Sequence, residues 1–323
     1  MKILITGGAG FIGSNLTRRL LKEKHVVTVI DDLSTGSMEN IKDFKENKHF
    51  HFELASILDI DILEKVIKPV DLVFHLAAAV GVEYIINNPL KSIEINVQGT
   101  ENVLKLSHKY KKKVILASTS EVYGKNGNDT LSENDDRILG STTISRWSYS
   151  NTKALDEFLA LAYYHEKKLP VVIFRLFNTT GPGQVGDYGM VVPRFVKQAL
   201  LEKPLTVYGS GDQTRCFTHI YDVINALLSL MTNEKCLGEI FNIGNPQEVS
   251  INALAEAVMR KADSSSQIIR HSYDEVMGKN FEDMKRRVPN IDKIKKFTGW
   301  SPTLSLDNII NDVIKYNKET LRF

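Results

Sequence analysis

The chain has 323 residues, of which 42% are hydrophobic and 25% charged, and this balance predicts a folded enzyme-sized protein rather than a disordered one. Its formal net charge of +2 is too small to favour a nucleic-acid or anionic-membrane partner. No apolar run approaches the ~20 residues of a membrane-spanning helix, and its two cysteines have neither a disulfide framework nor a metal-binding spacing, so we expect a cytoplasmic, metal-free protein.

Short apolar runs alternate with longer amphipathic stretches through the first half of the chain. The runs predict strands at 2–6, 26–30, 49–54, 72–76, 114–117 and 171–176, and the stretches predict helices at 11–22, 60–67, 89–108 and 149–166. Because these strands are almost continuously apolar, we expect them to be buried on both faces. The sequence therefore predicts an α/β fold with a Rossmann-like, doubly wound parallel sheet of right-handed βαβ units.

The first strand runs directly into a glycine-rich turn, Gly7-Gly8-Ala9-Gly10-Phe11-Ile12-Gly13, which opens a helix. Glycines let the backbone approach a pyrophosphate, and the start of a helix favours its negative charge, so the turn predicts a dinucleotide site. A cleavable signal peptide is not expected, because its removal would destroy this turn. The second strand ends at Asp31-Asp32, where a carboxylate can accept bonds from ribose hydroxyls and would repel a 2′-phosphate, so NAD is favoured over NADP.

Four residues of the central region are candidates for catalysis. Tyr149 and Lys153 are four residues apart on a predicted helix and therefore share one face. Free tyrosine has a pKa near ~10, and a nearby ammonium group stabilises the phenolate. Thr119 and Glu121, at the end of the central strand, add a hydroxyl and a carboxylate to the same site. Together these residues predict redox chemistry on a bound hydroxyl, whereas His75, at the end of another strand, is interpreted as a structural histidine.

After Asn178 the pattern changes to a turn cluster at 180–183 and then to shorter mixed elements. Helices are predicted at 192–201, 222–231, 250–261 and 306–318, and strands at 205–208 and 239–243. We interpret residues 1–178 as the NAD-binding domain and residues 179–323 as a smaller C-terminal substrate-binding domain, partly interleaved with the first. No linker separates the two halves, so the site is expected between them.

The order of the motifs resembles, over essentially the whole length, that of the extended short-chain dehydrogenase/reductases that modify nucleotide sugars. The matching segments are 7–13, 74–78, 96–100, 118–124, 149–153, 175–178, 181–183, 191–195, 215–219 and 241–246. The resemblance implies a tightly held NAD, a UDP-sugar or other NDP-sugar substrate, and reversible oxidation at the sugar C4 hydroxyl. Ser56 is a departure, because many relatives have an aspartate there beside the adenine.

The same resemblance, with the motifs above, assigns binding residues. The residues expected to contact NAD are Gly7, Gly10, Phe11, Ile12, Gly13, Asp31, Asp32, Ser56, Ile57, Leu76, Ala77, Ala78, Asn96, Tyr149 and Lys153. Those expected to contact the UDP-sugar are Tyr84, Arg146, Asn178, Val192, Arg194, Val207, Tyr208, Arg215 and Arg287. The resemblance also implies a homodimer, in which helices 89–108 and 149–166 form a four-helix bundle with their copies through outer positions such as Leu155, Leu159 and Tyr163.

Three reactions can follow oxidation at C4: epimerisation, dehydration at C5 and C6, or decarboxylation of a C6 carboxylate. The pair Ser120-Glu121 resembles the residues found at this strand end in UDP-glucuronate decarboxylases. Simple epimerases usually have no acid at the second position, and dTDP-glucose-type dehydratases have an aspartate before the glutamate. Segments 146–149, 278–283 and 286–289 resemble the same decarboxylases. We therefore predict decarboxylation of UDP-glucuronate or its 2-acetamido analogue. A UDP-sugar 4-epimerase is the first alternative and an NDP-sugar 4,6-dehydratase the second. A non-catalytic NAD-binding regulator is the remaining one, and the intact Thr119, Tyr149 and Lys153 argue against it.

Overall fold

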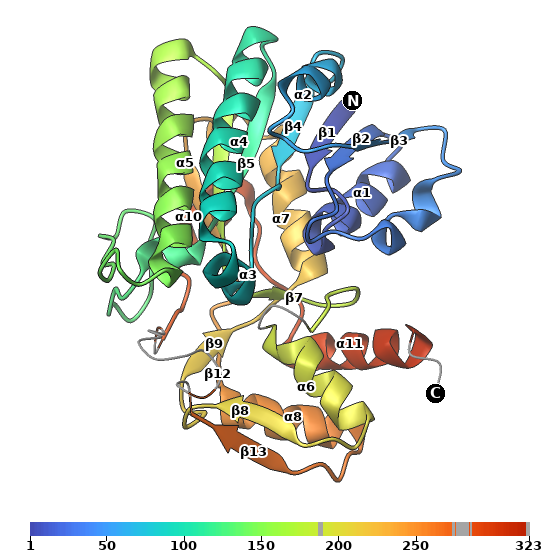
Figure 1. Ribbon diagram of the computed structural model, residues 1–323, viewed down its shortest axis with the longest axis vertical. Coiled ribbons are helices and arrows are strands. Elements are labelled where there is room, and N and C mark those ends of the chain that lie inside the picture. Colours follow the sequence, from blue (N-terminus) through green and yellow to red (C-terminus); the bar gives the residue numbers. More distant parts are fainter. Residues whose placement is uncertain (187–189, 273–274, 276–283, 285, 321–323) are drawn as a thin grey trace.

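The computed structural model describes residues 1–186, 190–272, 275, 284 and 286–320. Its centre is a sheet of seven parallel strands in the order β11-β6-β5-β4-β1-β2-β3 (Figure 1). These strands are β1 (Lys2–Thr6), β2 (Val26–Asp31), β3 (Phe50–Leu54), β4 (Leu72–His75), β5 (Lys113–Thr119), β6 (Val171–Leu176) and β11 (Ile240–Ile243). Strands β2 and β3 lie on one side of β1, and the chain then crosses over so that β4, β5 and β6 lie on the other side. The strand order therefore reverses at β1, and ligands of such sheets bind at the carboxyl ends of the strands near this reversal.

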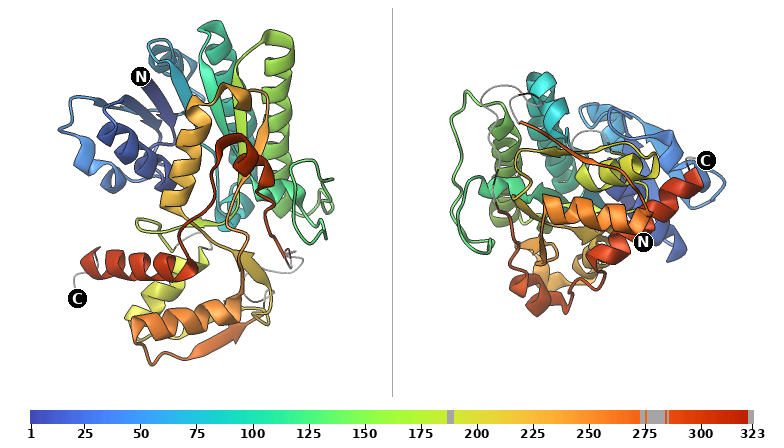
Figure 2. Two further views of the ribbon diagram at one scale, coloured as in Figure 1. Left: turned by 180° about the vertical axis from the view of Figure 1, so that it is seen from behind. Right: turned by 90° about the horizontal axis from the view of Figure 1, so that it is seen from below.

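Alternate side chains of each strand enter different core layers. Ile3 and Ile5 pack on one face of the sheet, which is covered by α1 (Phe11–Lys22), α7 (Ile220–Thr232) and α10 (Asp292–Thr298). Leu4 packs on the opposite face, beneath α2 (Ile60–Ile67), α4 (Pro89–Lys109) and α5 (Arg146–Lys167). Figure 1 shows α4 and α5 side by side in front, and the view from behind in Figure 2 shows α7 on the reverse face. Burial on both faces accounts for the continuous apolar character of the strands.

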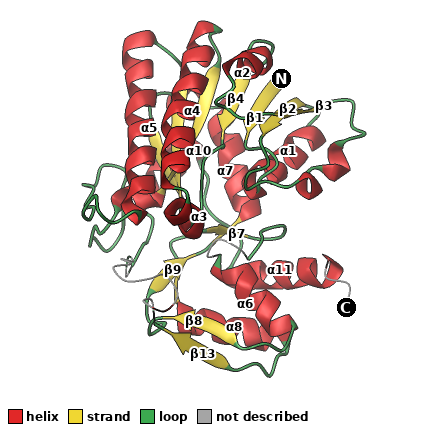
Figure 3. Cartoon of the chain, in the orientation of Figure 1, coloured by secondary structure: helices red, strands yellow, loops and turns green. Residues whose placement is uncertain are grey.

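Part of the second half of the chain forms a smaller unit below the sheet (Figure 3). Helices α6 (Val191–Leu200) and α8 (Ile251–Ala262) pack on β8 (Leu205–Tyr208), which pairs in parallel with β13 (Ile268–His271). Helix α11 (Leu306–Thr320) packs on α6 and α8. Their own hydrophobic core includes the buried Phe195, Leu254 and Ile310. This second core lets the smaller unit stand as a wall opposite the carboxyl ends of the large sheet.

The remaining elements are short. Two further strand pairs are β7 (Thr179–Thr180) with β10 (Thr218–His219), which is parallel, and β9 (Thr214–Cys216) with β12 (Glu248–Ser250), which is antiparallel. The short helices are α3 (Val82–Asn87) and the 3₁₀ turns η1 (Met38–Asn40), η2 (Lys42–Phe44), η3 (Ser120–Tyr123) and η4 (Glu234–Cys236).

The predicted α/β fold with a doubly wound parallel sheet is confirmed, and the predicted elements lie within a few residues of the observed ones. One placement needs correction. The strand predicted at 239–243 is β11, which pairs with β6 in the large sheet rather than lying in the smaller unit. Helix α7, also from the second half, packs on α1. The apolar run identifies β11 as a buried strand, but which edge it joins is decided by tertiary packing.

Within the part of the chain that the structure describes, no helix is both long and apolar enough to cross a membrane. The same residues contain no group of three or more His, Cys, Asp or Glu side chains arranged to hold a metal ion. Cys216 and Cys236 are buried free thiols.

Candidate active site

A cavity of about 1270 Å³ lies at the carboxyl ends of β1, β2, β4, β5 and β6. The smaller unit closes it from the other side through Val192 and Arg194 of α6, Tyr208 of β8 and Arg215 of β9. The predicted location between the two halves of the chain is therefore where the cavity lies, and most of the predicted site residues line it.

The turn after β1 is shaped to bring a ligand close to the backbone. Gly7 has φ of 72°, and a Cβ there would come within 2.8 Å of the backbone of Ala77. A Cβ on Gly13 would lie 2.4 Å from the carbonyl oxygen of Gly7, so both positions exclude side chains. Gly10 precedes the first residue of α1, and Phe11 and Ile12 begin that helix and line the cavity. This backbone and the start of α1 suit a pyrophosphate.

The end of β2 presents a buried carboxylate to the cavity. Asp31 accepts hydrogen bonds from the backbone N–H groups of Ala9 and Leu33, each at 2.8 Å. Burial raises the pKa of Asp31, although these two bonds act in the opposite direction. Asp32 is exposed and accepts a bond from the Ser34 N–H at 2.9 Å. Each Asp31 oxygen retains a lone pair with which a ribose hydroxyl could bond.

The loop after Asp32 also lines this end of the cavity, and the sequence reasoning missed it. Its lining residues are Ser34, Thr35, Gly36, Ser37, Glu39 and Asn40. Asn40 donates to the carbonyl of Ala9 at 2.8 Å, which ties the loop to the glycine turn. A Cβ on Gly36 would lie 2.9 Å from Asp31 Oδ1. A run of small polar residues after the strand was the only available signal, and it is common to many loops.

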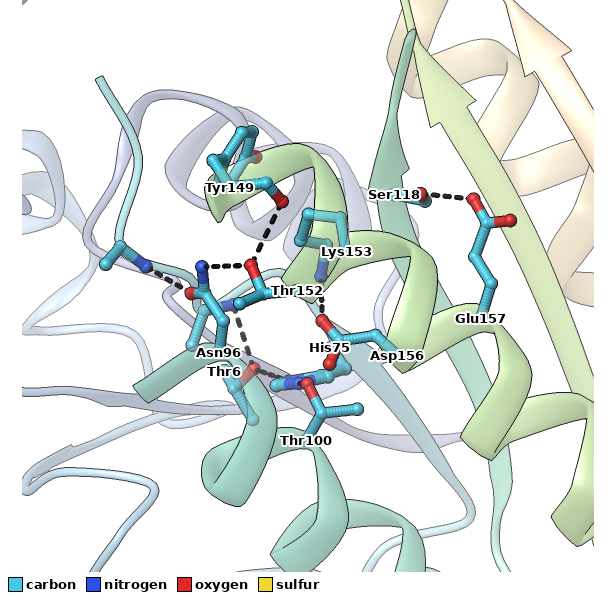
Figure 4. Close-up of polar contacts among 12 residues, drawn as sticks. Thr6, His75, Asn96, Thr100, Ser118, Tyr149, Thr152, Lys153, Asp156 and Glu157 are labelled. Carbon is cyan, nitrogen blue, oxygen red and sulfur yellow. Dashed lines mark hydrogen bonds and ion pairs between the residues drawn. The ribbon is translucent and has the colours of Figure 1, made fainter. Parts of the chain in front are cut away.

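Five more of the residues expected to contact NAD line the cavity, namely Ser56, Ile57, Leu76, Ala77 and Ala78. Three other expected binding residues, Asn96, Tyr84 and Val207, are not among the described residues that line this cavity, and their roles stay predictions. Asn96 on α4 accepts a hydrogen bond from the Ala79 N–H at 2.8 Å and donates one to Thr152 at 3.3 Å (Figure 4). Tyr84 packs against the core beneath α4 and α5. The side chain of Val207 packs in the core of the smaller unit.

Thr119, Glu121 and Tyr149 meet in the cavity where β5, η3 and α5 converge. The Thr119 hydroxyl caps η3 by accepting from the Glu121 N–H at 3.2 Å, and Ser150 ties η3 to α5 by donating to the Glu121 carbonyl at 2.7 Å. Burial raises the pKa of Tyr149, and the negative charges of Glu121 and Asp156 raise it further, against a hydrogen bond with Thr119. These effects favour the protonated phenol of Tyr149, and a positive charge close to it would favour the phenolate.

Lys153 also lines the cavity, and its ammonium group is bonded to a carboxylate of its own helix. Lys153 Nζ donates to Asp156 Oδ2 at 2.6 Å, one turn along α5 (Figure 4). Nearby, His75 bonds Thr6 at 2.7 Å and Thr100 at 3.0 Å. Burial, with the Lys153 charge, lowers the pKa of His75 to about 3, so His75 is neutral and structural, as predicted.

Arginines surround Glu121 at the far end of the cavity. Arg287 donates from Nη1 to Glu121 Oε1 at 2.5 Å and from Nη2 to Asn178 at 2.7 Å, and Arg146 donates to Glu121 Oε2 at 3.3 Å. Burial alone would raise the pKa of Glu121, but the charges of Arg287, Arg146 and Arg215 outweigh it and hold that pKa below its usual range. The sequence placed these residues in one site without showing that Glu121 pairs with the arginines. The predicted segment 278–283 lies outside the described residues.

The guanidinium group of Arg194 stacks on the ring of Tyr208 in the smaller unit. Its guanidinium carbon lies 4.2 Å from the centre of the Tyr208 ring, and Nη2 donates to the carbonyl of Thr206 at 3.1 Å. Val192 lines the cavity beside it. The cavity thus has Asp31, Asp32 and Glu39 at one end, and Glu121 with Arg146, Arg194, Arg215 and Arg287 toward the other. This second end has a surplus of positive charge.

Known proteins resemble this chain over nearly its whole length. Residues 4–313 match the family model described as GDP-mannose 4,6 dehydratase. The chain is 41% identical to UDP-N-acetyl-alpha-D-glucosaminuronate decarboxylase of Bacillus cytotoxicus over 98% of each chain. It is 34% identical to UDP-glucuronic acid decarboxylase 1 of Xenopus tropicalis, over 99% of this chain and 73% of that protein. Its fold matches a crystal structure of Bacillus cereus UDP-glucuronic acid 4-epimerase, in complex with UDP-glucuronic acid and NAD, with a TM-score of 0.89, 33% identity and 99% of each chain covered.

Proposed function

The chain is an enzyme of the extended short-chain dehydrogenase/reductase family that modifies nucleotide sugars, and from that premise we propose that it decarboxylates a UDP-glycuronate through oxidation at C4. UDP-N-acetylglucosaminuronate is the first substrate to test, because the relative named for it is 41% identical, against 34% for the Xenopus tropicalis UDP-glucuronic acid decarboxylase. UDP-glucuronate is the second.

NAD is the cofactor that we assign to the acidic end of the cavity, and when bound it supplies the hydride acceptor for oxidation at C4. The fit rests on the glycine turn, where side chains on Gly7 and Gly13 would strike the backbone, and on the buried carboxylate of Asp31. Asp31 would bond the adenosine ribose hydroxyls, and Ser56, Ile57, Leu76, Ala77 and Ala78 would line the pocket around the rest.

In the proposed reaction Tyr149 takes the proton of the C4 hydroxyl, Thr119 bonds the same oxygen, and the hydrogen on C4 leaves as a hydride, for which bound NAD would be the acceptor. The C6 carboxylate is then β to a ketone. The bond between C5 and C6 breaks, CO₂ leaves, and the electron pair moves to the C4 oxygen, where protonated Tyr149 and Thr119 donate hydrogen bonds. C5 finally takes up a proton. The raised pKa of Tyr149 suits the donor role, and a nearby positive charge is needed for the earlier base role.

The observation that carries the proposal is a set of four arginines that line this end of the cavity, two of which, Arg146 and Arg287, bond the carboxylate of Glu121. A UDP-glycuronate brings a diphosphate and a sugar carboxylate, and guanidinium groups bind two oxygens of such anions at once. Arg215, Arg194 and Asn178 are assigned to the UDP part, and Arg146 and Arg287 to the sugar end. Glu121 holds the latter pair, so it would position them rather than contact the substrate carboxylate, which it would repel.

The test incubates the protein with UDP-N-acetylglucosaminuronate, UDP-glucuronate, UDP-N-acetylglucosamine and UDP-glucose in parallel. CO₂ release and NMR of the sugar product are followed in each. We expect CO₂ and a UDP-pentose or UDP-4-keto-pentose from an acidic substrate and no product from the neutral ones. No CO₂ from either uronate would refute decarboxylation.

A 4-epimerase is the second candidate, favoured by the fold match to the Bacillus cereus UDP-glucuronic acid 4-epimerase. The same incubation separates the two functions. An epimerase would convert UDP-glucuronate into its C4 epimer with all carbon atoms retained.

We also propose a cytoplasmic homodimer in which α4 and α5 form a four-helix bundle with their copies. These helices lie side by side (Figure 1). They expose Leu90, Ile93, Leu155 and Phe158 by 41–69%. Leu159 and Tyr163, expected to be outer positions, are partly buried against the core, so Leu155 and Phe158 carry this part of the proposal. Apolar side chains at this density on one face favour a partner helix.

A further inference from the structure

Asp156 is a buried carboxylate beside the candidate catalytic lysine. Its side chain is 0% exposed, and that of Lys153 is 3% exposed. Lys153 Nζ donates to Asp156 Oδ2 at 2.6 Å, which is the length of a strong charge-assisted hydrogen bond. The two residues are three apart on α5, so helix geometry keeps them within reach. Neither the motif Tyr149–Lys153 nor the reaction proposed above assigns Asp156 a role.

The contact draws the ammonium group along α5 toward α4 and β4, and away from Tyr149 (Figure 4). From β4 and α4 the nearby polar groups are His75, which is neutral, and Thr100. Tyr149 is faced by Glu121 of η3 and by Arg287 of the C-terminal region, and by Asp156 on its own helix. Glu157 is turned to β5 and β6, where it pairs with Arg175 at 2.7 Å and with Ser118.

We propose that Asp156 is a positioning residue that holds the Lys153 ammonium group back from Tyr149 and so sets the pH at which Tyr149 can act as a base. The inference rests on the proposed role of Tyr149. A buried cation stabilises a phenolate more strongly the closer the two groups are. A carboxylate in direct contact with the cation offsets the positive charge that the phenolate would feel.

The sign of the effect follows from charge. In Asp156→Asn, Lys153 loses its ionic partner and can turn toward the phenol, and a negative charge is removed from the neighbourhood. Both changes stabilise the phenolate, so the pKa of Tyr149 should fall. Loss of one charged neighbour typically changes a pKa by about 1–3 units, so we expect a shift of about one pH unit or more.

The experiment measures tyrosinate absorbance against pH in the protein as purified. Asp156→Asn is compared with the wild type, and the corresponding Tyr149→Phe proteins serve as blanks that isolate Tyr149. We expect the Tyr149 curve of D156N to lie at lower pH. Coinciding curves, or a shift to higher pH, would overturn the proposal. If D156N does not fold, Asp156→Ser replaces it, since a serine leaves room for water beside Lys153.

Two controls test the positioning role. Glu157→Gln removes the neighbouring buried carboxylate, which pairs with Arg175 instead, and it should lower stability without moving the Tyr149 curve. In a Lys153→Met background the D156N shift should shrink, because Asp156 would act through the lysine. An undiminished shift there would show that Asp156 acts directly and would refute the positioning role.

The pH dependence of CO₂ release from UDP-N-acetylglucosaminuronate completes the test. Its rising limb should move to lower pH in D156N by the same interval as the tyrosinate curve. A tyrosinate shift without turnover of any uronate would refute the proposed function and leave the role of Asp156 standing. If D156N releases CO₂ but neither its tyrosinate curve nor the rising limb of its pH–rate profile moves, the role of Asp156 is refuted and the proposed function stands.

Discussion

Replacing Glu121 with glutamine tests the arginine cluster most directly. The Glu121 side chain is 19% exposed, and Arg146 and Arg287 are 7% and 9% exposed. Glutamine keeps the shape but removes the charge, which leaves the guanidinium groups facing each other across an amide. Breaking a buried ion pair from one side costs about 3–5 kcal/mol, and the partial exposure of Glu121 places the expected loss near about 3 kcal/mol of the free energy of unfolding.

Glu248→Gln is the matched control. Glu248 accepts from Arg286, the residue next to Arg287, at 2.7 Å, but this pair lies at the surface, where Arg286 is 43% exposed. Exposed pairs contribute about 0.2–1 kcal/mol, so E248Q should unfold in urea almost as the wild type does. Equal losses of stability in E121Q and E248Q would refute our interpretation of the buried cluster.

The pH dependence of this difference has a defined sign. The folded pKa of Glu121 lies below its usual range, so its contribution to stability is complete above the unfolded pKa of about 4.3 and is lost as the pH falls through the folded pKa. The stability gap between the wild type and E121Q should therefore be full at neutral pH and narrow below about pH 4.3. A gap that stays constant in acid would contradict the charge assignment.

Turnover should separate positioning from binding. If Glu121 positions the arginines around the oxidised sugar, E121Q should lower kcat by about 10²-fold or more while KM for UDP-N-acetylglucosaminuronate changes less. CO₂ release measures both constants. An unchanged kcat with a raised KM would show that Glu121 serves binding alone.

Tyr149→Phe should lower CO₂ release by about 10²–10⁴-fold, because the proton acceptor is lost, while calorimetry shows UDP-sugar binding intact; full activity would mean that the site is misplaced. Asp31→Ser should bring the affinity for NADP close to that for NAD in calorimetry, since the carboxylate that repels a 2′-phosphate is gone, and an unchanged preference would remove this role from Asp31. Phe158→Asp should give a monomer in light scattering at micromolar concentration, because it places a charge on the exposed face of α5; a wild-type protein that is already monomeric would refute the dimer.

Much of the first half of the protein could be predicted from local patterns. The apolar run of β1 and the glycine turn after it are both sterically informative within a few residues, because only small side chains fit where Gly7 and Gly13 pack. The helical repeat likewise placed Tyr149 and Lys153 on one face. These are features that neighbours in the sequence determine among themselves.

Tertiary structure decided which distant groups meet. Arg287 reaches Glu121 across 166 positions of sequence, and β11 returns from the second half to pair with β6. Even Lys153 and Asp156, three residues apart, could not be paired from the sequence alone. Whether the ammonium group turns to Asp156 or to Tyr149 depends on the burial and charge that the packed strands and helices impose. The burial of each charged group depends on how the whole chain packs. Burial in turn sets the free-energy penalty for leaving that charge without a partner.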